Sequence, residues 1–231
     1  MRLLLISSSN VHGYGYLDHA EPELRRILEG RRVAFVPFAL QNHDAYTAKV
    51  RERLAKMDVE VVQVRGRAEI EAAEAIFIGG GNTFRLLKRL YDDGLVEPIR
   101  DRVRHDGVPY IGSSAGTNVA TLSIKTTNDM PIVYPPTFDA LGFVPFQINP
   151  HYQDPDPNST HKGETREERI REFLEENDTP VVGLREGAML RVEDETITLV
   201  GDKPARIFRR GAEPEELAPG SVVTFSVAHV R

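Results

Sequence analysis

Short apolar runs alternate with charged, helix-like stretches over the first half of the chain. Apolar, strand-like runs cover residues 3–7, 33–37, 59–64, 76–78 and 109–111. Apolar residues at helical spacing predict helices over 22–29, 45–57, 70–75, 83–91 and 96–103. This alternation is typical of βαβ units, so we expect an α/β fold with a mostly parallel sheet and helices on both faces.

The pattern changes after about residue 120. The stretches 126–136 and 154–162 are polar or rich in proline, which predicts loops. A charged helix is predicted over 164–176, and strands over 144–148, 181–184, 188–192, 196–200, 205–208 and 222–227. We expect this β-rich C-terminal part to extend the sheet or to cover one of its edges. No linker or internal repeat divides the sequence, so residues 1–231 are predicted to form a single α/β domain.

Composition excludes several kinds of chemistry. The chain has no cysteine, so it can form neither disulfides nor thiolate metal sites and has no cysteine nucleophile. The net charge of −6 disfavours nucleic acid as a partner. No apolar run approaches the length of a membrane span, so no membrane partner is expected. A cytoplasmic location fits the lack of cysteine.

One glycine-flanked serine carries the strongest chemical signal. Residues 112–116 read Gly-Ser-Ser-Ala-Gly, which matches G-x-S-x-G with Ser114 at the centre. In a nucleophile elbow the chain turns sharply from strand to helix, and the flanking positions leave no room for a Cβ atom. Ser113 fails this test because its flanks are Ile111 and Ala115. The alternative is an ordinary glycine-rich turn without a chemical role.

A nucleophilic serine needs a base, which is usually histidine. The sequence has seven histidines, of which His151 and His161 follow the elbow and lie away from the C-terminus. His151 comes directly after an apolar run, at a predicted strand end, where ligands gather in α/β sheets. His161 lies in a polar run that is typical of a solvated loop. We therefore favour His151.

Two acids are candidates for orienting the histidine, and their spacing does not separate them. Asp129 lies in a loop between two apolar stretches, and Glu186 follows another predicted strand. The sequence Gly-Gly-Gly-Asn over residues 79–82 also follows a strand, but it matches no nucleotide-binding motif. Its backbone N–H groups could donate to an oxyanion together with the N–H of Ala115, or it is simply a tight turn.

A series of longer motifs resembles the peptidase E family, the α-aspartyl dipeptidases. The resemblance spans nearly the whole chain, and its motifs are GGGNTF, GSSAGTN, TTNDMPI, QINPH and HKGETREERIREF. It implies a flavodoxin-like fold related to class I glutamine amidotransferases, with serine in place of their cysteine. It also implies hydrolysis of dipeptides, and of some longer peptides or amides, that begin with aspartate.

The resemblance assigns roles to the residues already singled out. Ser114 corresponds to the nucleophile and His151 to the general base. It associates Asp129 with activity and offers Glu186 as the third member of a catalytic triad. We favour Glu186 as the direct partner of the histidine and keep both acids as candidates.

Other positions follow from the same resemblance. Gly81 and Ala115 correspond to the oxyanion-hole donors. Arg166 corresponds to an arginine that binds the aspartate side chain of the substrate, a role that suits the planar fork of a guanidinium. The departures are Ser113, where a bulkier residue is usual, and Thr117, where alanine is usual. We expect them to affect the shape of the pocket and the strictness of aspartate specificity.

The expected reaction is acyl transfer through Ser114, with no metal and no organic cofactor. The expected partner is a small peptide with N-terminal aspartate, and the protein is expected to be a monomer or a homodimer. One alternative is a cyanophycinase-like hydrolase that cleaves β-aspartyl–arginine bonds. Another is a non-catalytic binding protein on the same fold.

Overall fold

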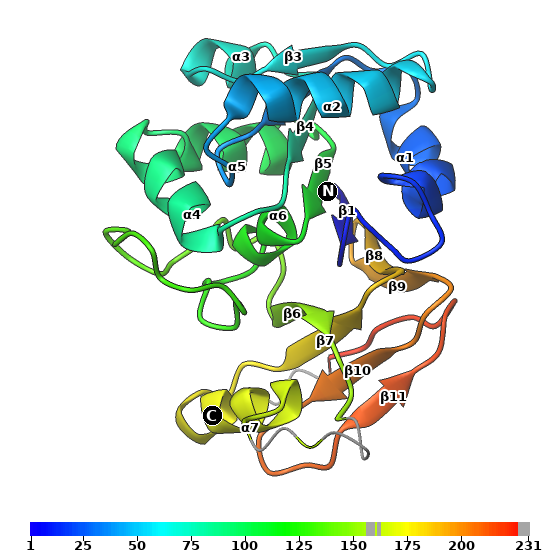
Figure 1. Cartoon of the computed structure of the whole chain (residues 1–231), viewed down its shortest axis with the longest axis vertical. Coiled ribbons are helices and arrows are strands. Elements are labelled where there is room, and N and C mark those ends of the chain that lie inside the picture. The colour runs from blue at the N-terminus through cyan, green and yellow to red at the C-terminus, as the bar shows by residue number, and fades with distance from the viewer. Residues whose placement is uncertain (156–159, 161–162, 226–231) are drawn as a thin grey trace.

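Two β-sheets organise the chain in the computed structural model, which describes residues 1–155, 160 and 163–225 (Figure 1). The strands are β1 (Arg2–Ile6), β2 (Val33–Val36), β3 (Val61–Gln63), β4 (Ala75–Ile78), β5 (Tyr110–Ser113), β6 (Gln147–Tyr152), β7 (Val181–Arg185), β8 (Ala188–Glu193), β9 (Thr196–Gly201), β10 (Ala205–Phe208) and β11 (Glu215–Leu217). The helices are α1 (Glu21–Leu28), α2 (His43–Ala55), α3 (Arg67–Glu71), α4 (Thr83–Asp92), α5 (Val96–Arg104), α6 (Ala115–Val119) and α7 (Arg166–Glu176), with a 3₁₀ turn η1 (Asp18–Ala20).

The larger sheet has seven strands in the order β3-β2-β4-β5-β1-β8-β9. The first five of these are parallel, and β8 and β9 continue the sheet in antiparallel pairing. The parallel part has the spatial order of a flavodoxin-like sheet, 2-1-3-4-5, if β2 is counted as the first strand. The fifth position is then occupied by β1, the first strand of the chain. The predicted mostly parallel α/β sheet is confirmed.

Side chains of the central strands point alternately to the two faces of this sheet. On β1, Leu3 and Leu5 pack into one core, and Leu4 and Ile6 pack into the other. Helices α1 and α2 cover the face of Leu4, and α4, α5 and α6 cover the face of Leu3. Full burial of each such side chain stabilises the fold by roughly 1.5–3 kcal/mol. Such a strand reads as a continuous apolar run because both of its faces are covered.

The smaller sheet has four strands in the order β11-β10-β7-β6. Strands β6 and β7 run parallel, and the pairs β7–β10 and β10–β11 are antiparallel. Helix α7 packs on this sheet through Ile170 and Leu174, which contact Tyr152 and Phe208 in a separate small core. Figure 1 shows α7 and this sheet at the opposite end of the molecule from α2 and α3. The C-terminal strands therefore both extend the main sheet and build a second one.

Most predicted elements are present, with shifted boundaries. The helix predicted over 70–75 ends at Glu71, because Ala75 begins β4 and pairs with Val33. The strand predicted over 144–148 begins only at Gln147. Pro145 just before it has no N–H to donate to a ladder.

Two differences lie near the C-terminus. Strand β11 was not predicted, because its Glu-Glu-Leu sequence has low strand propensity and it forms only by pairing with β10. The strand predicted over 222–227 is wrong for its described part. There, Val222 forms an isolated bridge with Thr198, and residues 226 and 227 lie outside the described residues.

The close contact between α6 and β4 makes a testable prediction about Gly116. A Cβ atom added at Gly116 would lie 2.0 Å from the carbonyl oxygen of Ile78, so the helix would have to move away from the sheet. Gly116→Ala is expected to lower the free energy of unfolding by roughly 1–3 kcal/mol or more, the usual cost of overpacking. Urea unfolding measures this cost. Gly66→Ala is the control, because a Cβ there meets nothing within 4 Å. Equal stability of the two variants would contradict the prediction.

Candidate active site

Ser114 lies in the turn between β5 and α6, at the carboxyl edge of the parallel strands. Its backbone has φ 52° and ψ −108°, a conformation that non-glycine residues rarely adopt. Its N–H donates to the carbonyl of Ile6 on β1 over 3.0 Å, which helps to fix the turn. A strained strand-to-helix turn that exposes a serine hydroxyl is the geometry of a nucleophile elbow.

The glycines around Ser114 are required by space, as the sequence predicted. A Cβ atom at Gly112 would lie 2.5 Å from the carbonyl oxygen of Gly116, and one at Gly80 would lie 3.0 Å from Cβ of Ser114. Ser113 and Thr117 are both fully buried, and neither lines the cavity beside Ser114. These two departures from the family pattern therefore lie behind the nucleophile rather than in the pocket.

His151 lies within β6, where the pairing with β7 is irregular between Pro150 and Tyr152. Its φ of 55° turns the imidazole out of the regular alternation of the strand. The backbone N–H of His151 donates to Oγ of Ser7 over 2.9 Å, and its Nε2 lies 2.8 Å from Oγ of Ser114. The structure therefore brings the predicted base within hydrogen-bond distance of the predicted nucleophile.

Glu186 follows β7 directly and completes a chain of hydrogen bonds. Its Oε1 lies 2.7 Å from Nδ1 of His151. A carboxylate only accepts here, so Nδ1 carries the hydrogen and Nε2 is free to accept the Ser114 hydroxyl hydrogen. The His151 and Glu186 side chains keep 35% and 43% of their exposure, so water reaches this end of the chain.

Asp129 occupies a different place from Glu186. Its Oδ2 accepts hydrogen bonds from the backbone N–H of Thr83 over 2.7 Å and from Oγ1 of Thr83 over 2.6 Å. Asp129 therefore caps the first turn of α4, where a carboxylate is stabilised by free N–H groups. It lines the same cavity as Ser114 and His151 but does not orient the imidazole. His161, the histidine we did not favour, lies outside the described residues.

The two predicted oxyanion donors flank the serine. Gly81 has φ 134°, and a Cβ atom there would lie 2.6 Å from the carbonyl oxygen of Ala39. Only glycine therefore allows this backbone to pass so close to the segment after β2. Ala115 is the first residue of α6, so its N–H has no partner within the helix. Gly81 lines the cavity and Ala115 directly follows Ser114, so both stay candidates for the oxyanion donors.

A cavity of about 800 Å³ opens beside Ser114. It is lined by Ser8, Ser9, Asn10, Tyr16, Leu40, Gln41, Asn42, Ala45, Tyr46, Lys49, Gly80, Gly81, Ser114, Asp129 and His151. Burial raises the pKa of Tyr16 and of Tyr46, so both phenols stay neutral. The charged groups among these lining residues are Lys49 and Asp129.

Arg166 is the first residue of α7, and a capping box at Thr165 fixes this end of the helix. Thr165 accepts from the N–H of Glu168, and the Glu168 carboxylate accepts from the N–H of Thr165. Burial and the nearby Arg169 lower the pKa of Arg166, while the carboxylate of Asp129 raises it. The Asp129 carboxylate is thus one of the charges that set the pKa of Arg166, although Arg166 does not line the cavity.

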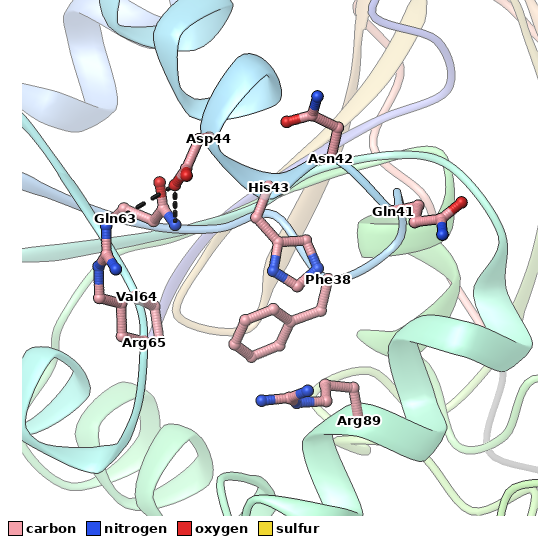
Figure 2. Close-up of a pocket in the computed structure, with 9 residues that line it drawn as sticks. All are labelled: Phe38, Gln41, Asn42, His43, Asp44, Gln63, Val64, Arg65 and Arg89. Atoms are coloured by element: carbon pink, nitrogen blue, oxygen red, sulfur yellow. Dashed lines mark hydrogen bonds and ion pairs between the residues drawn. The ribbon is translucent and has the colours of Figure 1, made fainter.

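A second cavity of about 740 Å³ lies on the other side of residues 41–42, which line both cavities (Figure 2). In Figure 2 the ring of Phe38 lies between the side chains of His43 and Arg89. Beside them, the Gln63 amide donates to Asp44 over 3.0 Å. None of the predicted site residues lines this second cavity.

The described part of the chain contains no group of three or more histidines and carboxylates placed to hold a metal ion. In the same residues, no helix has the length and apolar character that crossing a membrane requires.

Serine, histidine and glutamate in a hydrogen-bonded series, beside glycine-lined backbone donors, define a serine-hydrolase type of site. The profile of peptidase family S51 matches residues 3–200. The chain therefore belongs to peptidase family S51.

Similar proteins agree with this membership. A Streptomyces coelicolor protein named peptidase E is 59% identical over 96% of this chain and 93% of its own length. A Drosophila melanogaster protein named probable alpha-aspartyl dipeptidase is 52% identical over 96% of each chain. The crystal structure of a putative peptidase E from Listeria monocytogenes has a TM-score of 0.66 at 23% identity and covers 87% of this chain and 98% of its own, which shows a shared fold.

Some residues of the site were not predicted from the sequence. Ser7 ends the β1 region and holds the backbone of His151, and Thr83 holds Asp129. Tyr16 and Lys49 reach the cavity from outside the sheet. The position of Ser7 after the first parallel strand is the one signal that could have indicated its place at the site.

The Ser114–His151 contact predicts selective labelling by a fluorophosphonate, a reagent that phosphonylates activated serines. Wild-type protein should gain one adduct, on the peptide that contains Ser114, as measured by mass spectrometry. His151→Ala should slow labelling about 10²–10⁴-fold, because the general base is lost. Ser114→Ala is the control. An unlabelled wild type, or labelling that survives Ser114→Ala, would contradict this assignment.

Proposed function

We propose that this protein is a serine dipeptidase that removes aspartate from the N-terminus of small peptides. The observation that carries the proposal is the continuous hydrogen-bonded series Ser114–His151–Glu186, with distances of 2.8 and 2.7 Å, at the mouth of an open cavity. Membership of a peptidase family and the name of the Drosophila relative support aspartyl dipeptides as the substrate.

The proposed reaction has two halves. Oγ of Ser114 attacks the carbonyl carbon of the N-terminal residue while Nε2 of His151 takes its proton, and the carboxylate of Glu186 stabilises the imidazolium. His151 then gives this proton to the leaving amine, which departs with the second residue. Water attacks the acyl-enzyme with His151 again as base, and free aspartate leaves.

The negative charge of each tetrahedral intermediate falls on the former carbonyl oxygen. The backbone N–H groups of Gly81 and Ala115 are proposed to bind it. Such donors act strongly because they are fixed before the reaction, so no reorganisation is needed as the charge develops. Asp129 supports this arrangement indirectly, since it fixes Thr83, two residues after Gly81.

Recognition of an N-terminal aspartate requires a negative partner for its ammonium group and a positive partner for its side-chain carboxylate. Among the described residues that line the cavity, Asp129 is the one carboxylate, and its Oδ1 is proposed to accept the substrate's free ammonium group. Arg166, whose pKa responds to Asp129, is proposed to reach the side-chain carboxylate of the aspartate. The requirement for both charges would restrict the enzyme to the start of a peptide.

The cellular setting belongs to the same proposal. The protein is proposed to act in the cytoplasm as a single domain, either as a monomer or as a homodimer. The lack of cysteine is compatible with a reducing compartment. The proposed mechanism uses only groups of the chain itself, so it involves no cofactor.

The first test compares L-aspartyl-p-nitroanilide with its leucyl counterpart. The wild type should hydrolyse the aspartyl substrate with strong preference, and Ser114→Ala should lose this activity by at least about 10³-fold, as in other serine peptidases. Release of p-nitroaniline gives the rates. Hydrolysis of neither substrate by the wild type would overturn the proposed function, and unchanged activity in Ser114→Ala would overturn the proposed nucleophile.

A second test separates the two acids. Glu186→Gln should lower kcat about 10²–10⁴-fold, because the amide no longer stabilises the imidazolium. Asp129→Asn should mainly raise KM, because the partner of the substrate ammonium loses its charge. Steady-state kinetics on L-aspartyl-L-leucine measures both. The reverse result, with kcat lost in Asp129→Asn and kept in Glu186→Gln, would make Asp129 the acid that assists His151.

A further inference from the structure

Lys49 is a cation at the cavity that the proposed chemistry leaves without a role. It lies on α2 and lines the cavity together with Ser114 and His151. Its Nζ lies 4.1 Å from the centre of the Tyr16 ring, over the ring face. Among the described residues, no carboxylate lies within ion-pair distance of this ammonium group. Tyr16 therefore holds a charge near the reacting serine that is available to a ligand.

The next turn of α2 carries a second cation, Arg53, which has a structural role. Arg53 is buried and forms ion pairs with Asp18 over 2.9 Å and with Glu21 over 2.7 Å. Its Nε also donates to the backbone carbonyl of Tyr16 over 2.9 Å, which fixes the segment that carries the ring. Arg53 thus fixes the segment that carries Tyr16. Lys49, four residues earlier on α2, instead lines the cavity.

Lys49 and Arg166 belong to helices on opposite sides of the site. Figure 1 places α2, which carries Lys49, and α7, which carries Arg166, on opposite sides of the turn into α6 where Ser114 lies. A dipeptide that begins with aspartate also has two carboxylates, one on each side of the bond to be cleaved. The first is the aspartate side chain, and the second is the C-terminal carboxylate of the leaving residue.

We propose that Lys49 binds the C-terminal carboxylate of the dipeptide, on the leaving-group side of Ser114. The inference rests on the proposed aspartyl dipeptidase function and explains why the substrate would be a dipeptide in particular. The second residue carries a main-chain carboxylate only when the peptide ends there. An ammonium group on a flexible stem imposes little geometry on its partner, so many second residues are accommodated.

The test uses one pair of substrates that differ only in this charge, L-aspartyl-L-leucine and L-aspartyl-L-leucinamide. Wild type should prefer the free acid in kcat/KM. Lys49→Met should reduce this preference about tenfold, mainly through a higher KM for the acid, and Lys49→Arg should restore part of it. Lys56→Met is the matched control, because Lys56 is exposed just beyond the end of the same helix and does not line the cavity.

The other outcomes are each decisive. If Lys49→Met lowers kcat/KM equally for both substrates, Lys49 acts on the aspartyl side of the substrate or on the fold, and the inference is wrong. If the acid-to-amide preference is unchanged in Lys49→Met, Lys49 does not contact the C-terminal carboxylate. Failure of the proposed function is seen separately, because then the wild type cleaves neither substrate. Far-UV circular dichroism and thermal unfolding of each variant show whether it is folded.

Discussion

The buried hydroxyl of Ser7 joins the two sheets at the point where His151 meets Ser114. Oγ of Ser7, at the end of β1, donates to the carbonyl of Leu184 on β7 over 2.7 Å and accepts from the N–H of His151 on β6 over 2.9 Å. The nucleophile belongs to the larger sheet, whereas the histidine and glutamate belong to the smaller one. A shift of 1 Å between the sheets would break the contact between Ser114 and His151, so this junction sets the geometry of the site.

Glu186 has a charged neighbour, Arg185, that pairs with other carboxylates. Arg185 directly precedes Glu186, yet its guanidinium pairs with Asp154 over 2.6 Å and with Glu216 over 2.9 Å. These two carboxylates raise the pKa of Arg185 and hold its guanidinium by ion pairs. Glu186 is therefore free to accept the hydrogen bond from His151. The acidic residues around Arg185 thus prevent a competing ion pair at the site.

The sequence predicted the parts of the molecule that follow local rules. Periodicity gave the βαβ order, because central parallel strands are apolar on both faces and the helices between them are amphipathic. The elbow was predictable since its glycines are a steric necessity around Ser114. The strand-end rule led to His151, although the bulge that turns its ring toward the serine has no local signal.

The parts that could not be predicted all depend on contacts between distant segments. The sequence did not separate Asp129 from Glu186, because each follows an apolar stretch and only the tertiary structure sets which one meets His151. The sequence also did not predict a second sheet, because its strands have the same pattern of apolar residues as the strands that extend the first sheet. In the sequence, nothing distinguishes Lys49 from other lysines on a helix, and only the fold places it at the cavity.

The position of β1 in the middle of the larger sheet has a consequence for how the chain folds. Leu3 pairs with Tyr110 on one side and with Val192 on the other, so β1 cannot complete its pairing until two strands that come later in the chain have been made. Contacts of such long range are slow to form, because chain entropy must be lost before they are made. Until β8 emerges, β1 keeps an apolar edge unpaired, which is a period of exposure to aggregation. The partners of Ser7, Leu184 and His151, also come late in the chain, so the geometry of the site cannot form before most of the chain has been made.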